Sequence, residues 1–388
     1  MLNNQSNIDN LINASIAAGE YAGASLLVIK DGEELCRQVY GEADKEQHIP
    51  VRRDTIFHLY SMSKPITAVA VMMLYERGAL DVQGAVSKYL PCFKNMTVWT
   101  GAGEVPANRE ITVWDCLNMT SGIPYPNPET ESGRRLDKIF SELIARREAG
   151  EVVDTMEWMK EVAKAPLVFQ PGEKWMYGFS ADVLGAVVEA VSGKRFGQFL
   201  QEEIFVPLGM EDTGFFVPEE KRHRFAVSYE NWSTGALVPF TRSHLGEYYK
   251  PDVAFESGGA GLVSTIDDYA RFARMLLAGG RLGDVRILQK ETVALMSRNH
   301  LTENQRIEYN WDSVLGYGYG CLMRCLEDKA KANTMGSIGE YGWDGWTGNY
   351  VTVNPEKNTV LLFFVQRCGT GFGELTRKVR EEVYAELL

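Results

Sequence analysis

Apolar positions recur at two spacings near the N-terminus, and each spacing predicts a different element. Over residues 7–18 they return every three or four positions, which predicts an amphipathic helix. Two apolar runs follow at 24–30 and 35–40, on either side of Asp31-Gly32. Short apolar runs around an Asp-Gly pair are typical of a β-hairpin.

The C-terminal end of the chain predicts a similar set of elements. Apolar runs at 350–354 and 360–365 flank a turn at 355–358, and an amphipathic helix is predicted over 374–387. Strands at both ends and no convincing strand in the middle predict one antiparallel sheet that the two termini build together.

The middle of the chain is predicted to be mostly helical. Segment 180–192 is almost entirely apolar and closes at Gly193, as expected for a buried helix. Segment 265–278 begins with capping residues and stops at Gly279-Gly280. Loops rich in Gly, Pro and aromatic residues are predicted at 92–110, 123–135 and 232–258.

The predicted fold class is therefore α+β, as a single domain over residues 7–385 with two subdomains. Residues 1–78 and 260–388 would form the sheet-containing subdomain, and residues 79–259 the mostly helical one. A chain of 388 residues with 45% hydrophobic content can bury a large core. The seam between the subdomains is the natural place for a cleft.

Charge and cysteine usage narrow the range of partners and compartments. The net charge of −12 argues against nucleic acid or an anionic membrane surface as partner. The six cysteines are sparse and no histidine cluster accompanies the close pair Cys321 and Cys325, so we expect reduced thiols, no metal and no cofactor. Without an uninterrupted apolar stretch of about 18 residues or a secretory pattern at the start, we expect a cytoplasmic protein and no membrane partner.

Candidate chemistry centres on Ser61-Met62-Ser63-Lys64, which Pro65 and an apolar run follow directly. Proline suits the first turn of a helix, and residues three apart share a helix face, so the Lys64 amine can lie beside the Ser61 hydroxyl. A lysine near the start of a buried helix can serve as base for a serine nucleophile. The alternative is a surface cap with a solvated lysine.

A partner for this pair is sought in the segment 169–180, where Pro171-Gly172 predicts a turn ahead of Tyr177. A phenol close to Lys64 would have its phenolate stabilised by the ammonium and could relay a proton. The alternative for Tyr177 is core or rim packing. No Gly-x-Ser-x-Gly elbow occurs in the chain, and the histidines occur singly.

Several segments together resemble the serine β-lactamase-like family, which includes class C β-lactamases, D,D-peptidases and β-lactamase-fold esterases. The matching segments occur in the family's order and cover nearly the whole chain: 57–64, 111–122, 170–177, 207–210, 257–265 and 345–348. The resemblance implies the two-part β-lactamase/transpeptidase-like fold. It also implies Ser61 as acyl-accepting nucleophile, Lys64 as its base and Tyr177 as proton relay. The oxyanion would lie between the backbone N–H groups of Ser61 and Trp346.

Two motifs depart from the family's pattern. Where the family usually has Tyr-x-Asn, this chain has Tyr177-Gly178-Phe179, so a ring replaces an amide. Where it usually has Lys-Thr-Gly or His-Thr-Gly, this chain has Trp343-Asp344-Gly345, so an acid replaces the hydroxyl and the cation is missing. At about 4 Å and an effective dielectric near 20, Asp344 would oppose a substrate carboxylate by roughly 4 kcal/mol. Protonation, pairing with an arginine or a turned-away side chain would each remove that penalty.

These departures favour a carboxylesterase on small uncharged esters over the carboxylate-recognising members. The expected substrate-binding residues are Tyr125, Phe179, Trp343, Asp344 and Gly345. Alternatives are a β-lactamase, a D,D-carboxypeptidase, a D-amino-acid amidase in which Glu340 and Asp344 bind an amine, an acyltransferase, and a non-catalytic scaffold. The expected partner is a small ester or amide, and the sequence gives no prediction of oligomeric state.

Overall fold

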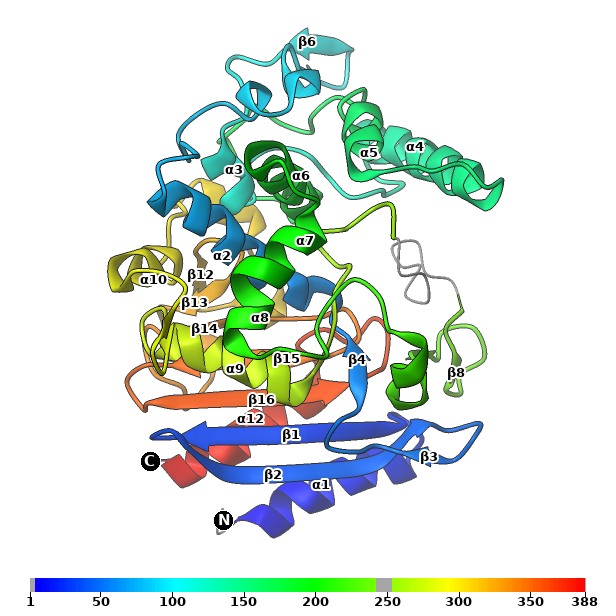
Figure 1. Ribbon diagram of the computed structural model, residues 1–388, viewed down its shortest axis with the longest axis vertical. Coiled ribbons are helices and arrows are strands. Elements are labelled where there is room, and N and C mark those ends of the chain that lie inside the picture. Colours follow the sequence, from blue (N-terminus) through cyan, green and yellow to red (C-terminus); the bar gives the residue numbers. More distant parts are fainter. Residues whose placement is uncertain (1–3, 242–252, 388) are drawn as a thin grey trace.

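An eight-stranded antiparallel sheet forms one side of the computed structural model, which describes residues 4–241 and 253–387 (Figure 1). The strand order is β12-β13-β14-β15-β16-β1-β2-β3, so the N-terminal hairpin pairs with the C-terminal one through β1 and β16. This confirms the predicted sheet built from both termini. The strands are β1 (Gly23–Lys30), β2 (Glu33–Asp44), β3 (Ile49–Pro50), β12 (Tyr317–Tyr319), β13 (Arg324–Leu326), β14 (Tyr341–Asp344), β15 (Tyr350–Asn354) and β16 (Thr359–Val365).

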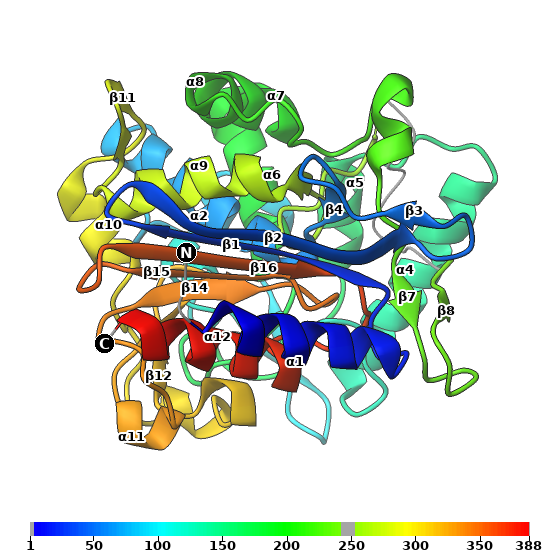
Figure 2. The ribbon, with the colours of Figure 1, turned by 90° about the horizontal axis from the view of Figure 1, so that it is seen from below.

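Helices cover both faces of this sheet, which explains why its central strands β1, β15 and β16 are buried at nearly every position. The terminal helices α1 (Gln5–Ala17) and α12 (Glu374–Leu387) lie together on the outer face (Figure 2). Along β1, Leu26 and Val28 pack with these helices, whereas Leu27 and Ile29 belong to the main core on the other face. Alternate strand residues point to opposite faces, so each covered face needs its own apolar set.

The inner face carries α9 (Ile266–Leu277), and the central helix α2 (Ser63–Glu76) lies beyond it. All residues of α2 from Ser63 to Leu74 are buried, as the apolar run predicted. The helix ends before Gly78, whose φ of +68° is the left-handed conformation that closes a helix. The predicted buried helix at 180–192 is α6 (Ser180–Ser192), which packs against α2.

The remaining elements surround this centre, mostly as short helices above the sheet (Figure 1). The helices are α3 (Val113–Leu117), α4 (Glu131–Glu148), α5 (Thr155–Val162), α7 (Phe196–Leu200), α8 (Val206–Leu208), α10 (Lys290–Met296) and α11 (Lys329–Ala332). The strand pairs are β4 (Ile56–His58) with β9 (Val263–Thr265), β5 (Thr97–Trp99) with β6 (Glu104–Pro106), β7 (Tyr229–Glu230) with β8 (Val238–Pro239), and β10 (Arg281–Leu282) with β11 (Val285–Arg286).

All three predicted loops are partly wrong. The loop predicted over 123–135 gives way to α4 at Glu131, because the Thr130 side chain accepts a hydrogen bond of 3.0 Å from the backbone N–H of Gly133 and caps the helix. The loop predicted over 92–110 contains the β5–β6 ribbon. The loop predicted over 232–258 contains the short strand β8, and its residues 242–252 lie outside the described residues. The subdomain limits at 78/79 and 259/260 stay a prediction. Within residues 4–241 and 253–387, no helix is both long and apolar enough to span a membrane.

Candidate active site

Ser61 lies at the entrance to α2, in a single 3-10 turn over Tyr60–Met62 that runs directly into the helix. Tyr60 has a φ of +46°, a left-handed conformation that is strained for a bulky residue. The Tyr60 ring packs edge-on against Trp346 with centroids 5.3 Å apart, and the backbone N–H of Leu59 donates to the carbonyl of Leu262 at 2.9 Å. These contacts hold the sharp turn that leads into the serine.

Lys64 is completely buried and uses its amine to join three parts of the chain. Its Nζ donates to Ser61 Oγ at 3.1 Å, to the Tyr125 hydroxyl at 3.0 Å and to the Gly259 carbonyl at 2.8 Å. Burial lowers the pKa of Lys64 to about 7, although the nearby charges of Asp182 and Asp344 oppose the shift. Near neutral pH a large fraction of the amine is therefore unprotonated and able to accept a proton from Ser61.

Tyr177 comes from the turn ahead of α6 and faces the same lysine. Its ring centroid lies 4.7 Å from Lys64 Nζ, and its hydroxyl accepts a hydrogen bond of 3.1 Å from Trp343 Nε1. Burial raises the pKa of Tyr177, while hydrogen bonds with Ser61 and Trp343 oppose the rise. The resting side chain is therefore a neutral phenol.

Three residues expected in the substrate pocket, Tyr125, Phe179 and Gly345, do not line the cavity beside Ser61. Tyr125 meets Lys64 through its hydroxyl and is not among the residues that line the cavity beside Ser61. Phe179 is fully buried and packs against the rings of Phe140 and Phe255, so it belongs to the core and cannot touch a substrate. A ring in the family's amide position thus serves packing of α6.

The turn after β14 packs directly against the backbone just ahead of Ser61. A side chain at Gly345 would place its Cβ 2.4 Å from the carbonyl oxygen of Leu59, so only glycine allows this proximity. The Asn349 side chain holds the turn in position, because it donates a hydrogen bond of 2.6 Å to the carbonyl of His58. Trp346 and Ser61 consequently border the same cavity.

That cavity has a volume of about 260 Å³ and is lined mainly by large apolar side chains. Its walls include Trp311, Val314, Trp343, Trp346 and Phe372, together with Ser61 and Tyr177. Trp346 also touches the exposed ring of Trp232 and the half-buried ring of Phe240, with centroids 5.9 and 5.2 Å away. Apolar walls suit the hydrocarbon part of a ligand.

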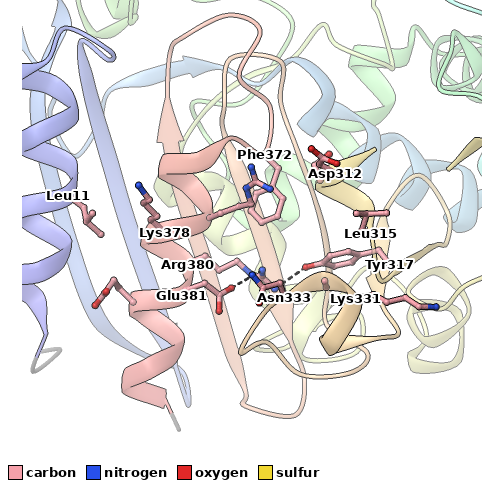
Figure 3. Close-up of a pocket in the computed structure, with 14 residues that line it drawn as sticks. Leu11, Asp312, Leu315, Tyr317, Lys331, Asn333, Phe372, Lys378, Arg380 and Glu381 are labelled. Atoms are coloured by element: carbon pink, nitrogen blue, oxygen red, sulfur yellow. Dashed lines mark hydrogen bonds and ion pairs between the residues drawn. The ribbon is translucent and has the colours of Figure 1, made fainter. Parts of the chain in front are cut away.

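A larger cavity of about 660 Å³ lies beside α12 (Figure 3). Ser313 and Phe372 border both cavities. Arg380, labelled in Figure 3, is not free to bind a ligand there, because it pairs with Glu340 and donates to the Tyr317 hydroxyl at 2.9 Å. Of these two cavities, Ser61 and Tyr177 border only the smaller one.

An arginine that the sequence reasoning missed neutralises the unusual acid of the third motif. Arg324, on β13, forms a buried ion pair with Asp344 at the end of β14. Three arrangements of Asp344 would remove its repulsion of a substrate carboxylate, and the structure shows one of them, the pairing with an arginine. Glu340, the other acid considered for amine binding, is 1% exposed and bound by Arg380 and by the Tyr384 hydroxyl, so it cannot meet a substrate.

A second missed residue is Asp182, which organises the far side of Lys64. Its carboxylate accepts hydrogen bonds from the Ser257 hydroxyl and, at 3.2 Å, from the backbone N–H of Gly259. These hydrogen bonds fix the position of the Gly259 carbonyl, which accepts a hydrogen bond from the Lys64 amine. The available signal was an acid near the start of the largely apolar segment 180–192, which holds only one other acid, Glu189.

The chain is similar to several known proteins over most of its length. Esterase EstB of Burkholderia gladioli is 31% identical over 398 residues, which cover 97% of this chain and 94% of that protein. Protein Rv1367c of Mycobacterium tuberculosis (strain ATCC 25618 / H37Rv) is 31% identical over 361 residues, covering 90% of this chain and 87% of the relative. Among solved structures, EstCE1, a hydrolase with promiscuous acyltransferase activity, superposes with a TM-score of 0.82 at 25% identity over 98% of both chains.

The family model described as Beta-lactamase matches residues 8–385, which is nearly the whole chain. The fold neighbours and the sheet built from both termini agree with that match. This chain belongs to the beta-lactamase family.

Proposed function

We propose that this protein is a serine carboxylesterase that acts on small uncharged esters through an acyl-enzyme. The observation that carries the proposal is the buried Lys64 amine, 3.1 Å from Ser61 Oγ and with its pKa lowered to about 7. A serine hydroxyl is a weak nucleophile unless a base lies within hydrogen-bond reach, and a base is most effective when its pKa is near the working pH. No cofactor is part of the proposal.

In the first half-reaction, Ser61 Oγ attacks the ester carbonyl carbon as its proton moves to Lys64. The backbone N–H groups of Ser61 and Trp346 would hold the oxyanion of the tetrahedral intermediate. The intermediate collapses by breaking the bond to the alkoxy oxygen, which takes a proton from the Tyr177 hydroxyl. Lys64 returns its proton to Tyr177, and the alcohol leaves. Water then attacks the acyl-serine by the same proton route in reverse and releases the acid.

The cavity supports an uncharged substrate with an apolar acyl group. Five aromatic rings form part of its wall, and among the described residues that line it the one guanidinium is already paired with Asp344. The relative EstB is an esterase, and EstCE1 is described as a hydrolase with promiscuous acyltransferase activity. Transfer of the acyl group to an alcohol is therefore the second candidate. The cytoplasmic location stays a prediction from the sequence.

Hydrolysis of p-nitrophenyl butyrate and nitrocefin, measured side by side on wild type and Ser61→Ala, tests the proposal. We expect ester turnover that the substitution abolishes, with little nitrocefin turnover. Rapid nitrocefin hydrolysis would instead support a β-lactamase. If neither substrate reacts in water but an added alcohol is acylated, the protein is an acyltransferase. Inactivity in all assays would favour a non-catalytic scaffold.

A further inference from the structure

The Arg324–Asp344 ion pair lies in the wall of the catalytic cavity, and its two partners differ in how far they reach into it. The Arg324 side chain is 3% exposed and that of Asp344 is 19% exposed. Any substrate group that enters this part of the cavity therefore meets the carboxylate more readily than the guanidinium.

Arg324 is held in place by a cage of rings. Its guanidinium carbon lies 4.5 Å from the ring centroid of Phe372, 5.3 Å from that of Tyr350 and 5.4 Å from that of Trp343. The guanidinium stacks readily on aromatic faces. The arginine consequently keeps its position if its acidic partner changes.

Hydrogen-bonding capacity is left over on this arginine. A guanidinium carries five N–H donors, and Nη1 donates to Asp344 Oδ1. Nη2 is buried and makes no hydrogen bond within the described part of the chain. An arginine fork of this kind matches a carboxylate, which it can bind through two parallel hydrogen bonds.

We propose that Asp344 occupies a carboxylate-binding position that Arg324 would otherwise offer to the substrate, and that this internal acid restricts the pocket to uncharged acyl groups. The ion pair is neutral as a whole, so an uncharged acyl chain enters without a charge penalty. A substrate carboxylate meets the like charge of Asp344 and finds the guanidinium already bound. This inference rests on the proposed esterase function and names the residues that set its substrate class.

Two esters of the same chain length test the inference: p-nitrophenyl hexanoate and mono-p-nitrophenyl adipate, which adds a terminal carboxylate. For wild type we expect a kcat/KM on the adipate ester at least about 100-fold below that on the hexanoate ester. In Asp344→Asn, which frees the guanidinium, the ratio of adipate to hexanoate turnover should rise by about tenfold or more. The double variant Arg324→Met/Asp344→Asn, which has neither charge, should gain clearly less.

An unchanged ratio in Asp344→Asn, or an equal gain in the double variant, would overturn the inference. If Asp344→Asn does not fold, Asp344→Ser provides the same comparison with a smaller side chain. A binding measurement that needs no turnover distinguishes failure of this inference from failure of the esterase proposal. In the Ser61→Ala background, calorimetry should show that adding Asp344→Asn strengthens binding of adipic acid monoamide, but not of hexanamide, by about tenfold. Equal effects on both amides would contradict the inference even for a protein that hydrolyses neither ester.

Discussion

Lys64 is central to the proposed mechanism because its amine is buried and can therefore act as a base. Water would solvate the ammonium, so complete burial lowers its pKa to about 7. The free amine has a pKa of 10.5, at which almost none would be unprotonated at neutral pH. The structure therefore links the depth of α2 in the core to the reactivity of Ser61.

The first prediction concerns pH. Because only the neutral amine accepts a proton, kcat/KM for p-nitrophenyl butyrate should fall about tenfold per pH unit below a midpoint near 7 and level off above it. The negative charge of Asp182 raises the pKa of Lys64, so Asp182→Asn should move the midpoint to lower pH, by about one unit. The exposed Asp137→Asn is the control and should leave the profile unchanged. A midpoint that moves to higher pH in Asp182→Asn would contradict this account.

The second prediction separates the two tyrosines that face Lys64. Tyr177→Phe keeps the ring beside Lys64 but removes the hydroxyl that would relay the proton, so kcat should fall by about 10²–10⁴-fold. Tyr125→Phe removes only one acceptor of the Lys64 amine and should cost about tenfold or less. Steady-state kinetics of both variants shows which hydroxyl relays the proton, and thermal unfolding checks that both variants are folded. A larger loss for Tyr125→Phe would reassign the relay to that residue.

Some of these residues could be predicted from the sequence and others could not. Ser61 and Lys64 are three apart on one helix, so local spacing alone suggests their contact. Arg324 and Asp344 stand 20 residues apart and meet only because β13 and β14 are neighbours in the sheet. No spacing rule links them. The one signal was a lone cation in the apolar run 321–326.

At the scale of the elements, the end of β14 determines where the proposed oxyanion donor lies. Its glycine allows the strand to approach the backbone just ahead of Ser61, and the Asn349 side chain fixes the turn that follows. The geometry of the site thus depends on one strand end meeting one helix start.

The third prediction tests that contact. Gly345→Ala would place a Cβ 2.4 Å from the Leu59 carbonyl oxygen, so the strand end must move away from the nucleophile. We expect kcat on p-nitrophenyl butyrate to fall by about 10²–10³-fold, comparable to loss of one oxyanion donor. Gly214→Ala is the matched control, because its nearest neighbour would be 3.9 Å away. Equal kinetics of the two variants would show that the approach of β14 has no part in catalysis.

Long or sharply bounded elements were predictable and short ones were not. The terminal hairpins and α6 carry apolar runs with clear turn residues at their ends. Strands β12 and β13 have three residues each, too few to show a period. Helix α4 is rich in charge, and the adjoining Pro- and Gly-containing segment suggested a loop, whereas in the structure its Thr130 cap starts a helix.

For the whole molecule, the sheet separates the core that contains α2 from the core that joins the termini. Ile12 of α1 packs with Val379 of α12 and with the outward residues of β1 and β16. The residues around α2 belong to a different cluster on the inner face. Phe372 of the outer cluster also borders the catalytic cavity, but Ile12 does not. A substitution at Ile12 can therefore perturb stability without touching the site.

The fourth prediction follows from that separation. Ile12→Ala removes a fully buried side chain from the outer cluster and should lower the free energy of unfolding by about 2–5 kcal/mol, measured by denaturant titration. The exposed Asn10→Ala on the same helix should change it by less than about 0.5 kcal/mol. At a temperature where both variants remain folded, kcat and KM should equal those of wild type, because the sheet lies between the cavity left by the substitution and Ser61. A change in kcat at full folding would mean that the outer helices act on the site through the sheet, and that the two cores form one mechanical unit.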